Sequence, residues 1–135
     1  MKKMAMTGLV IMTIAFACGC ATSAKGPTDA EIIKADIDAC LAAAKAGDID
    51  KVMTYYSEKF QHSQFGDKNG LGSFLVGASG YIEETEFDMS ASQTTITGDK
   101  ATIGPITISG DYGSYSLSFE ATKENGVWKI TGMDI

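Results

Sequence analysis

The side chains best suited to proton transfer lie close together near the middle of the sequence. His62 is the single histidine, and its side chain is the one that ordinarily titrates near neutral pH. Asp67 follows it, and Tyr55 and Tyr56 precede it. A histidine or carboxylate can act as a general base while a tyrosine hydroxyl orients a substrate oxygen. These four residues are therefore the catalytic candidates if the protein is an enzyme.

The same residues also have a structural interpretation, which we favour. A general base needs a partner that positions it, and none is evident in the sequence around His62. Tyrosines on an apolar helical face usually pack in the core with the hydroxyl at the rim. A pair of His62 and Asp67 would depend on closeness in sequence alone. The sequence therefore favours a non-catalytic binding protein over an enzyme.

Composition and charge exclude several other functions. All 11 basic residues are lysines, and without the residues before Cys20 the chain has 9 lysines against 17 acids, a net charge of −8. An acidic domain without arginine binds nucleic acid or anionic lipid headgroups poorly. One histidine, one remaining cysteine and no phosphate-binding loop give no basis for a metal or nucleotide site. We interpret the acidic residues between Glu83 and Asp88 as solvated, and we expect no metal, cofactor or nucleic-acid partner.

The first residues have the pattern of a secretory signal. Lys2 and Lys3 precede an apolar run from Met4 to Ala17, which is too short for a comfortable membrane span. The run ends in Ala17-Cys18-Gly19-Cys20, and small residues before a cysteine resemble the cleavage site of bacterial lipoproteins. We predict a lipoprotein signal peptide at 1–19, a tether at 20–27 and a domain at 28–135. Cys20 is the preferred lipidation site, and Cys18 is the alternative.

Lipidation would determine the cellular location of the protein. Acyl chains such as palmitate on the terminal cysteine would hold it on a membrane of the bacterial cell envelope, with the domain outside the cytoplasm, for example in the periplasm. Cys40 would then be the one cysteine left, too few for an internal disulfide. Its position on an apolar helical face predicts a buried, unreactive thiol.

Helices are expected to come first in the domain. Thr28 and Glu31 form a capping box for a helix that ends near Ala46, before Gly47. Asp48 can cap a second helix with an apolar face at Ile49, Val52, Met53 and Tyr56, and Asp67 a third. We expect the residues from Phe60 to Phe65 to be extended or looped.

From Glu86 onward the apolar residues alternate, which predicts about four antiparallel strands. Phe87, Met89 and Ala91 form the first alternating set, and a bulge is expected at Gly104-Pro105. A later strand has an inward face made of Tyr115, Leu117, Phe119 and Ala121, and Asn125-Gly126 predicts a tight hairpin. The predicted fold is α+β, with about three helices on one face of a curved, mostly antiparallel sheet.

The order of these motifs resembles the nuclear transport factor 2-like superfamily, which includes ketosteroid isomerase, scytalone dehydratase and SnoaL-type polyketide cyclases and has a cystatin-like cone-shaped fold. The features that carry the resemblance are the AGD corner between two helices, the YYSEKF exit, the glycine-rich third helix and the NGVWKITGMDI ending. Together they cover about 28–135. The resemblance implies a cone-shaped pocket between the sheet and the helices, and frequent dimers through the open sheet face.

The resemblance also implies which residues would line the pocket. They are Tyr56, Phe60, His62, Gln64, Phe74, Phe87, Tyr115, Phe119 and Trp128. The family's isomerase base would fall near Ser63-Gln64, where neither side chain is a base. The preferred function is therefore the binding of a small apolar or amphipathic ligand, or of a protein partner. The alternative is an isomerase, dehydratase or cyclase that uses His62 or Asp67 with Tyr55 or Tyr56.

Overall fold

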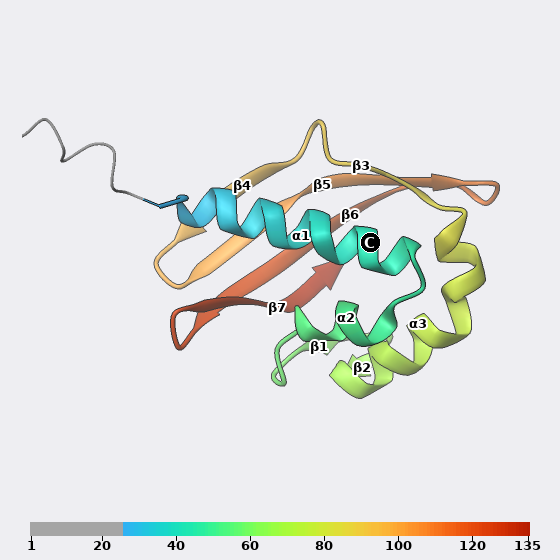
Figure 1. Ribbon diagram of the computed structural model, residues 1–135, viewed down its shortest axis with the longest axis horizontal. Helices are drawn as coiled ribbons and strands as arrows, with labels where there is room; N and C mark the ends of the chain where they lie inside the picture. Colours follow the sequence, from blue (N-terminus) through green and yellow to red (C-terminus); the bar gives the residue numbers. More distant parts are fainter. Residues whose placement is uncertain (1–25) are drawn as a thin grey trace, which may run out of the picture.

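The computed structural model describes residues 26–135, which form helices packed on one face of a twisted antiparallel sheet (Figure 1). The helices are α1 (Asp29–Lys45), α2 (Ile49–Thr54) and α3 (Lys68–Glu83). A small hairpin of β1 (Gln61–His62) and β2 (Gly66–Asp67) separates α2 from α3. The main sheet contains β3 (Glu86–Asp88), β4 (Gln93–Thr97), β5 (Lys100–Gly110), β6 (Gly113–Glu124) and β7 (Val127–Asp134). The predicted α+β class is confirmed; the predicted signal segment and its cysteines lie outside the described residues.

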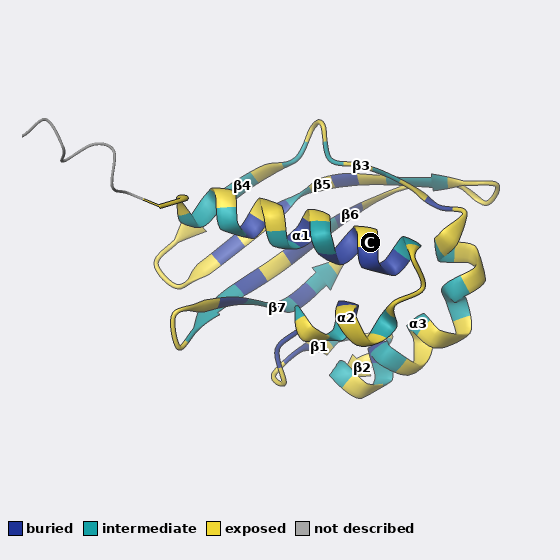
Figure 2. Ribbon diagram, viewed as in Figure 1, coloured by how far each residue is buried: buried dark blue, intermediate teal, exposed yellow. Residues whose placement is uncertain are grey.

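Helix α1 forms where the capping box predicts it. The Thr28 hydroxyl accepts from the Glu31 N–H at 3.2 Å, and the Glu31 carboxylate accepts from the Thr28 N–H at 2.7 Å. One face of the helix is buried against the sheet, as the blue stripe in Figure 2 shows. Its buried side chains are Ile33, Ile37, Cys40, Leu41, Ala43 and Ala44. Burial of each large apolar side chain contributes about 1.5–3 kcal/mol, so this stripe holds α1 in place.

The segment after α2 covers an edge of the sheet. Gly47 has a φ of 73°, which ends α1, and the Asp48 carboxylate caps α2 by accepting from the Lys51 N–H. Past α2, the Ile130 N–H donates to the Tyr55 carbonyl at 2.9 Å, and the Ser57 N–H donates to the Ile130 carbonyl at 2.8 Å. The backbone after α2 therefore occupies hydrogen-bonding positions on the exposed side of β7.

The sheet has the order β3-β5-β6-β7, with β4 also paired to β5. The predicted bulge is present, because the register between β5 and β6 shifts between Ile103 and Ile106. Ile103 pairs with Phe119 and Ile106 with Leu117, and all four side chains are buried. The bulge thus explains how Ile103 and Ile106, an odd number of positions apart on β5, can both face the core.

Two predictions about the strands are wrong. Met89 and Ala91 do not continue a strand from Phe87, because the residues after β3 form a turn in which Ala91 is exposed. The Asp88 carboxylate accepts from the Ser90 N–H at 2.8 Å, and the Ser92 hydroxyl donates to the Met89 carbonyl at 2.8 Å. Short polar side chains thus divide the predicted strand into β3 and β4.

The second correction concerns Tyr115. It lies in register with Ile108 on the core-facing side of β6, yet it is 52% exposed. On this part of the sheet the helices do not cover the inward-facing side chains, whereas Leu117, Phe119 and Ala121 further along β6 are buried.

Across the described residues, no helix is long and apolar enough to span a membrane.

Candidate functional site

An aromatic stack joins the small hairpin to α3. The rings of His62 and Phe65 lie 4.6 Å apart between centroids with planes 18° apart, and those of Phe65 and Phe74 lie 4.5 Å apart. Phe65 is half-buried, but Phe74 is 49% exposed. We call His62, Phe65 and Phe74 the aromatic stack. A half-exposed ring beside a hydrophobic core leaves apolar surface available for contact with another molecule.

Local backbone geometry determines the position of the aromatic stack. His62 pairs with Gly66 and Gln61 with Asp67, and Gly66 has a φ of 72°, so glycine suits the point where the chain turns back. The Asp67 carboxylate then accepts from the Gly70 N–H at 2.9 Å and caps α3, as the sequence predicts. The short hairpin and the cap together set Phe65 against a ring on the second turn of α3.

His62 is held in a state that does not suit a general base. Its Nδ1 accepts a hydrogen bond from the Gln64 N–H at 3.1 Å. In neutral imidazole one ring nitrogen accepts and the other carries the proton, so Nε2 is the protonated nitrogen here. Neutral His62 therefore has no free lone pair for a substrate proton unless the bond to Gln64 breaks.

Within residues 26–135, none of the other three catalytic candidates forms a hydrogen bond or an aromatic contact with His62. Asp67 lies opposite Gln61 in the hairpin, so its side chain and that of His62 leave the two strands on opposite faces. Tyr56 is buried and meets Phe60 edge to face at 5.2 Å, and burial raises the pKa of its hydroxyl well above the ordinary value. Tyr55 is half-buried at the end of α2.

The predicted pocket residues divide into two groups. Tyr56, Phe60, Phe119 and Trp128 are buried members of the core. His62, Gln64, Phe74, Phe87 and Tyr115 are half-buried or exposed. Phe87 lines a cavity of about 230 Å³ between α1 and β3, together with Leu41 and Met89. The first group supports the fold from within, and only the second group is accessible to a ligand.

Phe65 is the residue that the sequence analysis missed. It connects His62 to Phe74, which were both predicted to line a pocket. The signal was the QFGD segment, in which an aromatic residue precedes a turn glycine and a helix cap. A helix cap fixes the chain direction just before the helix, and so places the preceding aromatic residue against it.

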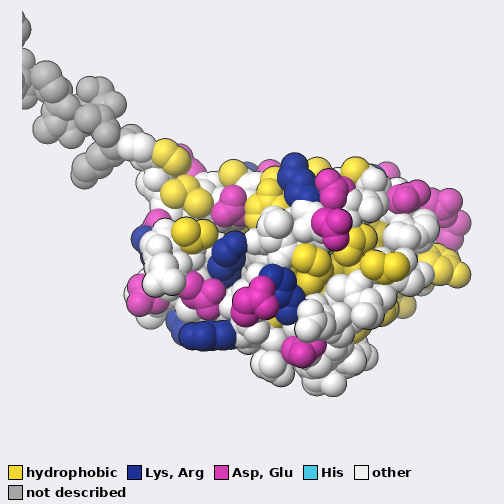
Figure 3. Space-filling model, turned by 60° about the horizontal axis from the view of Figure 1, so that its bottom comes forward, with side chains coloured by type: hydrophobic (Ala, Val, Ile, Leu, Met, Phe, Trp, Pro, Cys, Tyr) yellow, Lys and Arg dark blue, Asp and Glu magenta, His cyan; other side chains and the backbone are white. Residues whose placement is uncertain are grey.

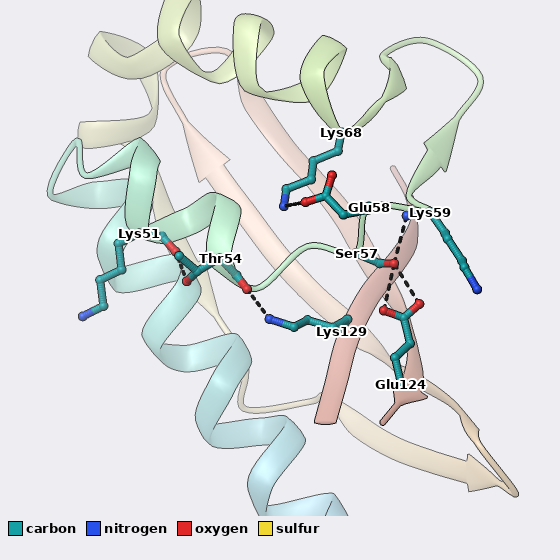
Figure 4. A network of polar contacts seen from close by, with 8 residues as sticks. All are labelled: Lys51, Thr54, Ser57, Glu58, Lys59, Lys68, Glu124 and Lys129. Atoms are coloured by element: carbon teal, nitrogen blue, oxygen red, sulfur yellow. Dashed lines mark hydrogen bonds and ion pairs between the residues drawn. The ribbon is translucent and has the colours of Figure 1, made fainter. Parts of the chain in front are cut away.

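A polar cleft of about 540 Å³ was also missed. It lies where the exit of α2 meets the end of the β6–β7 hairpin, and Ser57, Lys59, Lys100, Thr122 and Glu124 are among its lining residues. Figure 4 shows Glu124 reaching Ser57 from β6, with Lys59 beside them. The cleft contains both cations and carboxylates, and the Lys100 ammonium donates to the Thr122 hydroxyl at 3.1 Å.

A third hollow lies between α2 and α3. It has a volume of about 500 Å³, and Ile49, Met53, Gly72 and Val76 are among its lining residues. Beside it, the Lys68 ammonium bonds to the Glu58 carboxylate at 2.6 Å, which ties the start of α3 to the loop after α2 (Figure 4). Within residues 26–135, no group of three or more histidine, cysteine, aspartate or glutamate side chains is arranged to hold a metal ion.

The comparisons with solved structures identify the fold. A nuclear transport factor 2-like protein of unknown function from Pseudomonas putida superposes with a TM-score of 0.62 at 15% identity, over 75% of this chain and 80% of that one. A protein of unknown function with a cystatin-like fold from Nostoc punctiforme gives 0.64 at 14% identity, over 81% and 92%. No protein-family model and no curated protein matches the sequence.

A third similar structure is a putative calcium/calmodulin-dependent protein kinase II association domain from Xanthomonas campestris, with a TM-score of 0.60 at 15% identity over 79% and 86% of the two chains. The matches span most of both chains, and the order of helices and strands agrees with the resemblance seen in the sequence. The chain therefore has the nuclear transport factor 2-like, cystatin-like α+β fold.

Proposed function

We propose that this protein is a non-catalytic binding module that holds a small apolar or amphipathic ligand against the aromatic stack. The observation that carries the proposal is the exposed ring of Phe74, which is supported from behind by Phe65 and His62. A ring fixed in this way offers a ligand a rigid apolar face at little entropic cost.

Other apolar side chains on or next to α3 are also partly exposed. Leu75 and Ile82 lie on α3, and Phe65 precedes it; all three pack against the core while keeping part of their surface exposed. A polar end of an amphipathic ligand would meet the protonated Nε2 of His62, which can donate a hydrogen bond.

The state of His62 supports binding over catalysis. Its Nδ1 is occupied by the Gln64 N–H, and Asp67 caps α3 instead of facing the imidazole. Loss of a general base typically lowers a rate by about 100- to 10,000-fold. Loss of one hydrogen bond to a ligand costs only about 1 kcal/mol. The variant His62→Gln separates the two roles, because glutamine keeps hydrogen bonding without basicity.

The binding test uses the neutral dye N-phenyl-1-naphthylamine with the full chain carrying Cys20→Ser, so that no detergent is needed. We expect fluorescence enhancement on binding. Removal of an aromatic contact by Phe74→Ala should raise the dissociation constant by about 5- to 10-fold, which corresponds to about 1–1.5 kcal/mol. Val127→Ala is the control, since Val127 is 52% exposed on β7 and lines neither the stack nor any of the hollows described above.

Two results would count against the proposal. Equal dye affinity of Phe74→Ala and Val127→Ala would separate the site from the aromatic stack. Turnover of an enone, enol or hydroxy-ketone substrate by the wild type, lost in His62→Gln, would favour an isomerase, dehydratase or cyclase. Mass spectrometry of protein purified from its native membrane would identify a retained ligand.

We also propose that a lipid on Cys20 attaches the domain to a membrane of the bacterial envelope. The support is the apolar run followed by Ala17-Cys18-Gly19-Cys20 in the sequence. Replacement of Cys20 by serine should release the protein from membranes, whereas Cys18→Ser should leave it attached. Membrane retention of Cys20→Ser with release of Cys18→Ser would move the lipid to Cys18.

A further inference from the structure

Another cavity lies at the end of α3, whereas the aromatic stack lies near the start of that helix. Its volume is about 480 Å³, which suits a small ligand. It is lined by Tyr81, Glu84, Gly110, Asp111 and Tyr112. Asp111 and Tyr112 form the two-residue loop between β5 and β6, since Gly110 pairs with Gly113. None of these residues belongs to the proposed apolar site.

Exposed aromatic rings line this cavity. Tyr81 is 74% exposed and Tyr112 is 46% exposed. Tyr112 also stacks with Tyr115, with ring centroids 5.9 Å apart and planes 25° apart. The faces of aromatic rings carry negative potential and attract cations that lie within about 6 Å. Two tyrosines at an exposed cavity are therefore side chains that can contact a positively charged group.

The Tyr112 ring is fixed in position by a buried hydroxyl. Thr85 is buried, and its Oγ1 lies 2.8 Å from the Tyr81 carbonyl oxygen and 2.8 Å from the Tyr112 hydroxyl. A carbonyl only accepts, so the Thr85 proton goes to Tyr81, and the Tyr112 hydroxyl must donate to Thr85. At Gly110, a Cβ atom would come within 2.7 Å of the Tyr112 ring, so glycine permits this close approach.

Acidic residues outnumber basic ones in the segments that form the cavity. The sequence has no basic residue in 69–99 or in 101–122, while Glu83, Glu84, Glu86, Asp88 and Asp111 are acidic. Glu86 pairs with Lys45 of α1 at 3.8 Å, whereas the ion pairs found within residues 26–135 use neither Glu84 nor Asp111. Figure 3 shows acidic side chains gathered beside hydrophobic ones at the end of the molecule away from the grey trace.

We propose that this cavity binds a small organic cation of the quaternary ammonium type. The tyrosine faces would contact its methyl groups, and the carboxylates of Glu84 and Asp111 would balance its charge. The start of α1 and the β5–β6 hairpin lie at opposite ends of the molecule in Figure 1. This step rests on the proposed lipid at Cys20: a domain attached through the residues before α1 would have the cavity at its far end, which favours a cation from solution over a lipid headgroup.

Tetramethylammonium and choline are the probes, titrated into the full chain in a maltoside detergent at constant ionic strength and followed by calorimetry or ligand-observed NMR. Potassium is the comparison cation, because it carries the same charge but has no methyl groups to contact the aromatic rings. Tyr81→Leu keeps an apolar side chain and removes the ring, Glu84→Gln removes one charge, and Tyr112→Phe frees the second ring from Thr85. Asp99→Asn, an exposed acid outside the cavity, is the matched control for charge.

We expect the wild type to bind tetramethylammonium more tightly than potassium. Tyr81→Leu should raise the dissociation constant for tetramethylammonium by about 2- to 5-fold and leave potassium unchanged. Glu84→Gln should weaken both cations, Tyr112→Phe should weaken tetramethylammonium, and Asp99→Asn should change neither. Equal affinity for the two cations, or no effect of Tyr81→Leu, would overturn the proposal.

A separate arm tests the source of the cation. Phosphatidylcholine vesicles should not sediment the Cys20→Ser chain, while free choline should bind it. Sedimentation with these vesicles in the absence of choline binding would overturn the assignment to a soluble cation.

Discussion

The Ser57 hydroxyl lies 2.8 and 3.0 Å from the two carboxylate oxygens of Glu124, although the residues are 67 positions apart in sequence. Ser57 is only 2% exposed, and its Oγ also accepts from the Lys59 N–H at 3.0 Å. The hydroxyl therefore donates to a carboxylate and accepts from the backbone at once. This contact joins the exit of α2 to the end of β6 (Figure 4).

Removal of that hydroxyl should destabilise the fold. We expect Ser57→Ala to lower the free energy of unfolding by about 1–3 kcal/mol, because it deprives the Lys59 N–H of an acceptor and Glu124 of a donor at a part-buried contact. Urea denaturation measures the change. Ser114→Ala, at an exposed serine of β6, should stay within about 0.5 kcal/mol of the wild type. Equal unfolding midpoints for the two variants would show that the Ser57–Glu124 contact contributes nothing.

Asp29 should make stability depend on acid pH. Within residues 26–135 the Trp128 indole N–H has no partner at hydrogen-bonding distance. Its interaction with the Asp29 carboxylate is still the largest of the causes that lower the pKa of Asp29 from 3.8. The Lys123 ammonium, 3.2 Å from the carboxylate, lowers the pKa further. A lowered pKa stabilises the folded state above 3.8, and this contribution disappears as the pH falls through the lowered value.

The measurement compares the urea midpoints of the wild type and Asp29→Asn. The wild type should be more stable at neutral pH, and the difference should vanish well below pH 3.8. Asp38→Asn, at an exposed acid on the same helix, is the control. A difference that persisted unchanged into strong acid would exclude an effect of the Asp29 charge.

Cys40 should be inert in the folded protein. It is 2% exposed, and burial, followed by the charge of Asp36, raises the pKa of its thiol from 9.0 to about 12. The reactive thiolate is therefore scarce at neutral pH, and a maleimide should label Cys40 only after denaturation. The raised pKa stabilises the folded state below pH 9.0, and this contribution is lost as the pH rises toward 12. Rapid labelling of the native protein would contradict the buried assignment.

Two glycines of α3 should respond in opposite ways to alanine. A Cβ at Gly70 would overlap the Phe65 carbonyl oxygen, so Gly70→Ala should displace Phe65, destabilise the helix start and weaken dye binding at the aromatic stack. At Gly77 nothing lies within 4 Å, so Gly77→Ala should stabilise the protein by about 0.5–1 kcal/mol. Thermal unfolding and the dye titration test both. Unchanged dye affinity in folded Gly70→Ala would remove Phe65 from the site.

Dimers through the open sheet face remain a prediction. The side chains that face away from the helices on β5 and β6 are mostly polar, such as Thr102, Thr107 and Ser116, and they are exposed. Sedimentation of the Cys20→Ser chain would measure the oligomeric state.

Local interactions could be predicted from the sequence because their partners lie a few residues apart. Thr28 and Glu31 cap α1, and Asp48 and Asp67 cap the next two helices. Asn125 and Gly126 adopt the positive φ values of a tight hairpin, 51° and 80°. Alternation also predicted the buried face of Leu117, Phe119 and Ala121. Each of these features follows from backbone geometry and the period of the apolar residues.

The accessible surfaces were decided by the tertiary structure. Tyr115 shares the alternation of Leu117, but its exposure depends on which part of the sheet the helices cover. Ser57 meets Glu124, and Thr85 meets Tyr112, only because strand register and helix packing bring distant segments together. A sequence determines which face of each element is apolar, and it leaves open how far the opposing element extends over that face. That extent separates core residues such as Phe119 from exposed ones such as Phe74.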